Sequence, residues 1–205
     1  VKAKDAAGNT TAYSTTWSFT TAAATTTVGQ GTGEVNVTIG PDGGQTVLDS
    51  FTLQTQAGTD TVTNVTVTLA AGTNAGIGLI EITDGGSSVF GSVANPATNS
   101  VSIPLTTNIT ATTTSTEFYS EITPKSAAAM PTVPGASYVV TGTVTAITST
   151  NPKAYNDTVS ATVTIDNLSP GNVTGAGGTP FAGSNNLVWT NPGDADFSQV
   201  VVLRR

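Results

Sequence analysis

The sequence predicts an all-β protein whose central part is an antiparallel β-sandwich. Threonine supplies 42 of the 205 residues, and its β-branched side chain fits a pleated sheet better than a helix. Short stretches alternate apolar with polar residues and are separated by Gly, Asn and Pro, which is typical of strands with one buried and one solvated face. The helical pattern is limited to residues 126–130, too few for more than a turn.

The first predicted strands of the central region lie at residues 35–39, 51–55 and 62–69. Pro, Asp and two Gly residues at 41–44 predict a turn after the first of them. In the third strand the alternation slips after Val62, because the next apolar residue comes three positions later. Such a slip indicates a β-bulge.

The clearest hairpin of the sequence follows. Ile80 and Ile82 precede Asp-Gly-Gly at residues 84–86, and Val89 and Phe90 come next; Asp-Gly and Gly-Gly favour tight hairpin turns. The remaining strands are predicted at residues 101–103, ending at Pro104, at 118–122, at 138–147 as one long strand, and at 159–165.

Two segments read as joints between modules. Residues 22–33 (AAATTTVGQGTG) are small and polar, and residues 166–170 (DNLSP) end in a stiffening Pro. The glycines at 29–33 resemble a phosphate-binding loop only superficially, since no Lys-Ser/Thr or helix follows. We therefore expect a linker there, and three parts: residues 1–24, 25–167 and 168–205.

Charge and composition exclude several classes of function. The net charge is −7 and the isoelectric point is about 4.1, which argues against nucleic acids and anionic membranes as partners. The absence of cysteine excludes disulfides and thiolate metal sites. Because histidine is absent as well, the usual general base and thiol nucleophile are missing, and we expect no enzymatic activity. No apolar run is long enough to span a membrane.

The two ends carry motifs of a known kind of module, in reversed order. KAKDAAGN at residues 2–9, followed by Tyr13 and Ser14, resembles the late strands of bacterial fibronectin type III-like modules. LVWTNP at residues 187–192, followed by residues 194–197 and 200–203, is similar to their early strands, with Trp189 as the core tryptophan. WSFTT at residues 17–21 also resembles the final strand of bacterial Ig-like domains, and residues 25–166 resemble Ig-like modules of repetitive bacterial surface proteins.

These resemblances imply a complete Ig-like sandwich flanked by partial fibronectin type III-like pieces, in an extracellular, non-catalytic stalk or adhesin of the cell surface. Its partners would be neighbouring modules or subunits of the same protein. The end pieces lack the middle strands of a module. Two explanations remain: the chain is a piece of a longer array, which we favour, or neighbouring subunits complete one another by strand exchange into a filament.

Calcium is the one cofactor for which the sequence offers ligands, because hard cations take carboxylate and carbonyl oxygens from loops. Asp194 and Asp196 are spaced to share a loop, and Asp166 with Asn167 lies at the joint between modules. Asp5 with Asn9 forms a third candidate pair. The alternative is that all are turn residues, which we favour since no dense Asp-x-Asp-x-Asp-Gly cluster occurs.

A surface glycan or a protein ligand bound on exposed loops is the remaining functional alternative. A carbohydrate platform needs exposed aromatic rings, and Tyr119 and Tyr155 are the candidates. The other aromatic residues alternate on apolar faces, so we expect them in the core. These are Trp17, Phe19, Phe51, Tyr138 and Trp189.

Overall fold

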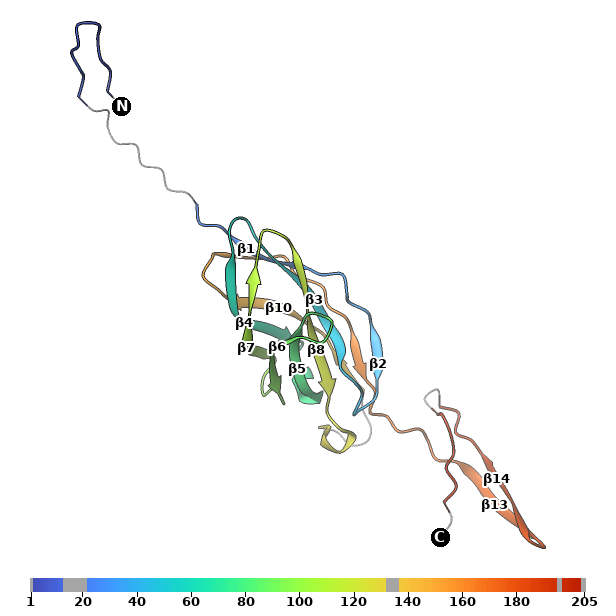
Figure 1. The fold of residues 1–205 in the computed structure, drawn as a ribbon. Helices are drawn as coiled ribbons and strands as arrows, with labels where there is room; N and C mark the ends of the chain where they lie inside the picture. The colour runs from blue at the N-terminus through green and yellow to red at the C-terminus, as the bar shows by residue number, and fades with distance from the viewer. Residues whose placement is uncertain (1, 13–21, 132–136, 195–196, 204–205) are drawn as a thin grey trace.

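The computed structural model describes residues 2–12, 22–131, 137–194 and 197–203, and it shows the all-β fold that the sequence predicts (Figure 1). The strands are β1 (Thr26–Gln30), β2 (Val37–Ile39), β3 (Thr46–Thr55), β4 (Asp60–Leu69), β5 (Ile77–Thr83), β6 (Val89–Ala94), β7 (Ser100–Ala111), β8 (Thr116–Pro124), β9 (Tyr138–Val140), β10 (Gly142–Thr148), β11 (Lys153–Tyr155), β12 (Val163–Ile165), β13 (Thr174–Phe181) and β14 (Ser184–Thr190). Two short 3₁₀ turns, η1 (Thr73–Gly76) and η2 (Ala127–Ala129), complete the list.

Three sheets enclose the core of the central sandwich. A six-stranded sheet runs in the order β11-β1-β3-β8-β5-β6, and two three-stranded sheets have the orders β10-β4-β7 and β2-β12-β9. One continuous cluster of buried apolar side chains draws on all three, so they are layers of one domain. Most neighbouring strands are antiparallel, but β1 pairs with β11 and β2 with β12 in parallel, which the sequence did not predict.

The core follows from the period-two alternation. Phe51, predicted to be a core residue, is fully buried, and its ring lies 5.9 Å from that of Phe118. Phe118 in turn meets Phe90 edge to face at 5.5 Å, a preferred geometry for aromatic pairs. Each fully buried large aliphatic or aromatic side chain stabilises the fold by about 1.5–3 kcal/mol. Tyr138, also predicted to be a core residue, is partly buried and packs against this core.

The predicted local features around β4, β5 and β6 are confirmed. β5 and β6 pair antiparallel as a hairpin, whose turn places Gly85 at φ 73°, a conformation that glycine adopts at little cost. The side chain of Asp84 accepts hydrogen bonds from the N–H groups of Gly86 and Ser88. The register between β4 and β7 shifts after Val62, as expected for a bulge. The short turn predicted near residues 126–130 is η2.

The expectations for three segments of the central region are wrong. The expected linker contains β1, paired on both sides with β3 and β11. β7 does not end at Pro104 but continues through it to Ala111; the proline is tolerated because β7 is an outer strand of its sheet and a register shift follows. The expected single strand at 138–147 is divided between β9 and β10, which belong to different sheets.

A close approach of two backbones accompanies this last division. Gly142, the first residue of β10, lies so close to β4 that an added Cβ would come within 2.9 Å of the Thr68 carbonyl oxygen and 3.0 Å of Leu69 Cα. The chain therefore crosses from one sheet to the other at a position where only glycine fits.

The flanking parts form hairpins of their own. Near the N-terminus, Lys4 and Thr10 pair through an isolated bridge. At the other end β13 pairs with β14, and both strands are exposed along their length. Trp189, expected in a core, retains 40% exposure, because its hairpin has no second sheet packed over it in the part of the chain that the structure describes. Trp17 and Phe19 lie outside the described residues.

Replacement of Gly142 by alanine tests the close approach of β10 to β4. Because the new Cβ meets backbone atoms that cannot rotate away, we expect a loss of about 1–3 kcal/mol in the free energy of unfolding. Gly40→Ala is the matched control, since nothing lies within 4 Å of its added Cβ. Equilibrium denaturation in urea provides the measurement, and equal stability of the two variants would contradict the proposed crossing.

Candidate functional site

The first and last segments of the central domain run side by side and in the same direction. Figure 1 shows the chain from β1 to β2 following the length of the sandwich, and residues 152–166 accompany it through the pairs β1·β11 and β2·β12. We call residues 26–39 together with residues 152–166 the terminal seam. It joins two segments separated by more than a hundred positions in the sequence.

The part of the terminal seam around β1 and β11, which we call its upper part, is a parallel ladder. One side chain extends this ladder. The N–H of Thr26 donates to the carbonyl oxygen of Pro152 at 2.8 Å, and that of Asn156 donates to Val28 at 2.8 Å. Beyond the ladder the amide of Gln30 bonds to the opposite backbone: its Oε1 accepts from the N–H groups of Thr158 and Val159 at 3.1 and 2.9 Å, and its Nε2 donates to the Val159 carbonyl at 3.1 Å. The side chain of Gln30 therefore continues the contact between the two segments beyond the last residue pair of the β1·β11 ladder.

The lower part of the terminal seam, around β2 and β12, repeats this arrangement. Asn36 Oδ1 accepts from the N–H of Thr162 at 2.7 Å, just before β2 and β12 come together. The N–H of Val37 donates to the Thr162 carbonyl at 3.1 Å, and the N–H of Asp166 donates to Ile39 at 2.8 Å. The terminal seam is thus hydrogen-bonded at intervals along its whole length.

A buried carboxylate fixes the upper end of the terminal seam. Asp60, the first residue of β4, accepts hydrogen bonds from the Thr26 hydroxyl at 2.7 Å and from the N–H groups of Thr150 and Asn151 at 3.0 and 3.4 Å. Burial by itself raises the pKa of Asp60, but the hydrogen bonds it accepts outweigh burial and hold the pKa below its usual value. The ionised carboxylate therefore ties the loop before β11 to β1.

Two further carboxyl groups meet in the middle of the terminal seam. Asp49 of β3 is fully buried, and Asp157 of the terminal seam is 8% exposed. The N–H of Val144 donates to Asp49 Oδ2 at 2.9 Å and to Asp157 Oδ2 at 3.2 Å, so the two carboxyl groups converge on one donor. Asp49 and Asp157, which we call the carboxyl pair, connect the six-stranded sheet, β10 and the terminal seam.

The surroundings of the carboxyl pair disfavour negative charge. Burial and the charge of Asp157 raise the pKa of Asp49 to about 9, and burial raises the pKa of Asp157 to about 6. The nearby carboxylate of Glu34 acts in the same direction on both. The Oδ1 atoms of Asp49 and Asp157 are buried and receive no hydrogen bond from the N–H and O–H groups placed by the structure.

The predicted calcium ligands are occupied in turns. Asp166 Oδ1 accepts from the N–H of Leu168 at 3.0 Å and from the Ser137 hydroxyl at 3.2 Å, and Asn167 is buried. Asp194 is exposed, and its Oδ2 accepts from the N–H of Gly171 at 2.7 Å.

Asp196 lies outside the described residues. Within the described ranges, no three acidic or histidine side chains gather in a way that could hold a metal ion. The Asp5 carboxylate accepts from the N–H and the side-chain amide of Asn9, and these hydrogen bonds lower its pKa. Calcium binding at the predicted positions stays a prediction.

Of the two tyrosines proposed for carbohydrate stacking, Tyr119 packs against the backbone and Tyr155 is hydrogen-bonded through its hydroxyl. The ring of Tyr119 lies against Gly33 and Gly85, each so close that an added Cβ would come within 2.4 Å of a ring carbon. Tyr155 is 42% exposed, and its hydroxyl accepts a hydrogen bond from the N–H of Ile147 at 3.2 Å. Neither arrangement resembles a stripe of open rings.

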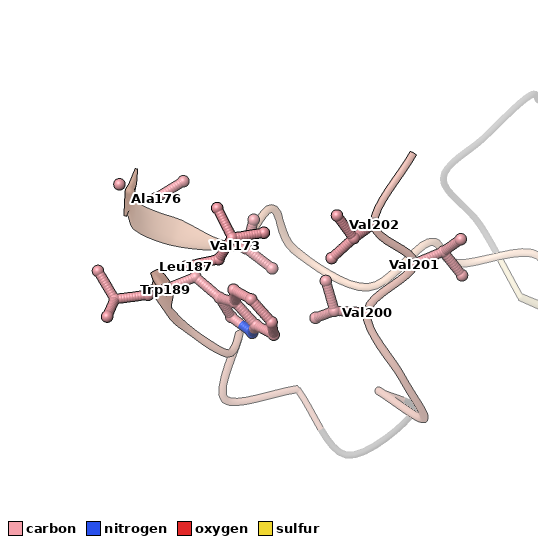
Figure 2. Close-up of a pocket in the computed structure, with 9 residues that line it drawn as sticks. Val173, Ala176, Leu187, Trp189, Val200, Val201 and Val202 are labelled. Carbon is pink, nitrogen blue, oxygen red and sulfur yellow. The ribbon is translucent and has the colours of Figure 1, made fainter. Parts of the chain in front are cut away.

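The exposed C-terminal hairpin carries an apolar pocket. In Figure 2 the indole of Trp189 faces Val200 and Val202, while Val201 points the other way. This alternation resembles that of a strand, although the segment pairs with no strand in the described part of the chain. The pocket is lined by Val173, Ala176, Gly177, Leu187, Val188, Trp189, Val200, Val201 and Val202.

Comparison of the sequence with protein-family models and with curated proteins finds no match. No helix in the described ranges is long and apolar enough to cross a membrane. The geometry of the terminal seam and of the exposed hairpin therefore carries the functional argument.

Sequence reasoning did not find the carboxyl pair, although one signal was present. Asp49 interrupts the apolar run of β3, next to Leu48 and close to Phe51, where a charged residue needs a partner. Asp157 gives no such signal, because it lies in a polar stretch. Only the fold brings the two together.

Asp60→Asn tests the hydrogen bonds that the Asp60 carboxylate accepts at the upper end of the terminal seam. The amide keeps one acceptor oxygen but turns an NH₂ group toward donors, so we expect a loss of about 1–3 kcal/mol in unfolding free energy at neutral pH. The pKa of Asp60 is lowered from 3.8 in the folded state. The stabilisation by the ionised group is therefore present above pH 3.8 and is lost as the pH falls through the folded pKa.

The difference between Asp60→Asn and the unmodified protein should accordingly shrink below about pH 3.8. Thermal unfolding followed by circular dichroism from pH 2.5 to 7, roughly the window set by this linkage, gives the comparison. Asp42→Asn is the control, since Asp42 is an exposed turn residue at φ 58°, a conformation that Asn also adopts. A pH-independent effect of Asp60→Asn would contradict the proposed role.

Proposed function

We propose that the chain is a load-bearing structural segment of an extracellular, multi-domain surface protein, a stalk or adhesin built from sandwich modules. The observation that carries this proposal is the terminal seam. The central domain receives the chain at β1 and releases it after β12, and these ends are joined by parallel pairing along the sandwich.

Parallel pairing of terminal strands determines how a pulling force acts. When both ends of such a domain are pulled apart, the force runs along the strands and across their hydrogen bonds. The bonds of the terminal seam then share the load and must yield together. In an antiparallel pair pulled from one end, the bonds break one after another. A domain with a terminal seam is therefore suited to transmit tension between neighbouring modules.

Composition supports the same proposal. The net charge of −7 keeps such a protein soluble and disfavours binding to nucleic acid or anionic lipid. The chain has no cysteine, so its stability rests on the core and on strand pairing and does not require an oxidising environment. The resemblance of residues 25–166 to Ig-like modules of bacterial surface proteins, and of both ends to fibronectin type III-like modules, agrees with this role.

Single-molecule pulling through two engineered cysteines tests the load-bearing role, since the chain has none of its own. Handles at Ala24→Cys and Ser169→Cys load the terminal seam in shear. Handles at Ala24→Cys and Ala57→Cys peel β1 from β3, whose antiparallel register places both handles at one end. We expect a clearly higher unfolding force in the first geometry; equal forces would reject the proposal.

The side chain of Gln30 offers a second reading of the same experiment. Gln30→Ala removes three hydrogen bonds across the terminal seam and should lower both the shear force and the unfolding free energy, the latter by about 1–3 kcal/mol. Gln54→Ala is the matched control, because Gln54 lies on β3 outside the terminal seam and its amide donates to the Thr113 carbonyl.

Assembly into filaments by strand complementation between chains is a second candidate function. The apolar pocket of the C-terminal hairpin supports it, because the pocket presents valine, leucine and tryptophan side chains to solvent beside open strand edges. The occupant would be an apolar strand from another copy or from a neighbouring module, added to the hairpin by β-augmentation.

Sedimentation velocity over a range of protein concentrations tests this second candidate. We expect association that the double variant Leu187→Ser, Trp189→Ser abolishes, because both residues line the pocket. Phe181→Ser is the control: Phe181 is 61% exposed on the same hairpin but does not line the pocket. A monomer at all concentrations, or equal association of both variants, would rule out assembly through this face.

A further inference from the structure

The carboxyl pair buries two acidic groups side by side, which is costly unless both are satisfied. Both Asp49 and Asp157 receive the same N–H, from Val144, and each keeps a buried Oδ1 atom without a donor from the described groups. The two Oδ1 atoms therefore need a hydrogen-bond donor.

We propose that Asp49 and Asp157 share one proton, and that loss of this proton on raising the pH releases residues 156–162 of the terminal seam from β3 and β10. A carboxyl group that keeps its proton donates one hydrogen bond, and its ionised neighbour accepts it. One proton on the carboxyl pair therefore supplies the donor that the buried oxygens lack, and it leaves a single negative charge in place of two.

The charged groups around the pair favour this state. Glu34, between β1 and β2, is a further acid that acts on both members, and β10 has no titratable side chain. The amino group of Lys153, the lysine of the terminal seam, donates to the carbonyl oxygen of Ser149 at 2.7 Å. Since the neighbouring ionisable side chain is acidic, the pair can reduce its charge most directly by holding a proton.

The direction of the pH dependence follows from the raised pKa values of both groups. Between the usual pKa of 3.8 and the folded value of about 9 for Asp49, the folded protein binds more protons than the unfolded chain. Stability contributed by the pair is thus fully present below the usual pKa and declines as the pH rises through the folded values. This is opposite to the behaviour of Asp60.

The position of the two residues indicates which part moves. Asp49 is fixed in β3 and completely buried, while Asp157 lies at the rim, between β11 and β12 in a stretch outside the regular strands. A second negative charge is relieved most easily when Asp157 turns outward to water. Such a movement breaks its bond to Val144 and loads the neighbouring contacts of Gln30 with Thr158 and Val159.

This inference deepens the proposed load-bearing function, on which it rests for its biological meaning, since it assigns regulation by pH to the same terminal seam. The two proposals fail separately. Equal forces in the two pulling geometries reject load bearing and leave the shared proton intact, whereas an ordinary titration of the pair rejects the shared proton and leaves the shear geometry intact.

Carbon-13 NMR of the aspartate carboxyl groups in the unmodified protein is the direct test. We expect two aspartate signals to titrate well above the usual range and in a coupled manner, and Asp49→Asn or Asp157→Asn to remove one signal and shift the other. If every aspartate signal titrates below about pH 5, near the ordinary values, the proposal is overturned. That outcome is measured on the unmodified protein and does not depend on the folding of either variant.

Hydrogen exchange followed by mass spectrometry tests the release of residues 156–162 of the terminal seam. After correction for the intrinsic rate, peptides covering residues 156–162 should open increasingly between pH 6 and 9, by up to about tenfold per pH unit for each proton released. Peptides of β4 should not. Asp49→Asn should remove this dependence, because its amide donates permanently to Asp157. Uniform opening, or an unchanged dependence in Asp49→Asn, contradicts the proposal.

A cation in place of the proton is the competing explanation, and the same samples decide it. Calcium chloride added at pH 8 should leave the melting temperature of the unmodified protein unchanged. A rise that Asp49→Asn abolishes would show that the carboxyl pair holds a metal ion, and would overturn the shared proton. Asp60→Asn serves as the control for a general effect of removing one buried charge.

Discussion

The structure depends on the parallel pairing of the first and last segments of the central domain. β1 and β2 belong to different sheets, and so do their partners β11 and β12, so the terminal seam binds both sheets along one side of the sandwich. Its contacts span almost the whole length of the domain in sequence. Pairing segments so far apart in the sequence is entropically costly, and the side-chain amides of Gln30 and Asn36 add hydrogen bonds to the short ladders.

The carboxyl pair attaches the terminal seam to β10. β10 is an outer strand of its sheet, and the N–H of Val144, a buried residue, would otherwise be a buried donor without an acceptor. Two carboxyl groups turned inward satisfy this N–H and at the same time attach the terminal seam. Inward-pointing charged residues are a common protection of sheet edges. Here they also make the attachment sensitive to protonation, because neither group is hydrated well enough to ionise freely.

Local patterns predicted local structure well and failed where distant segments decide. The turn around Gly85 and the bulge after Val62 follow from neighbouring residues alone. The division of residues 138–147 into β9 and β10 does not, because each half follows a partner elsewhere in the chain. The candidate site behaves in the same way: Asp49 is conspicuous in its apolar strand, but no sequence pattern links it to Asp157.

The sequence by itself determined the all-β class, since threonine-rich alternation with Gly and Pro between the strands suits pleated sheets with one dry face. It also set the acidic, cysteine-free chemistry of the chain. Tertiary structure alone decided the parallel terminal seam, the strand at residues 26–30 within an apparent linker, and the meeting of two carboxyl groups. The physical reason is that strands pair through backbone N–H and C=O groups. These groups are the same in every residue except proline, so the local sequence does not specify which distant strand will be the partner.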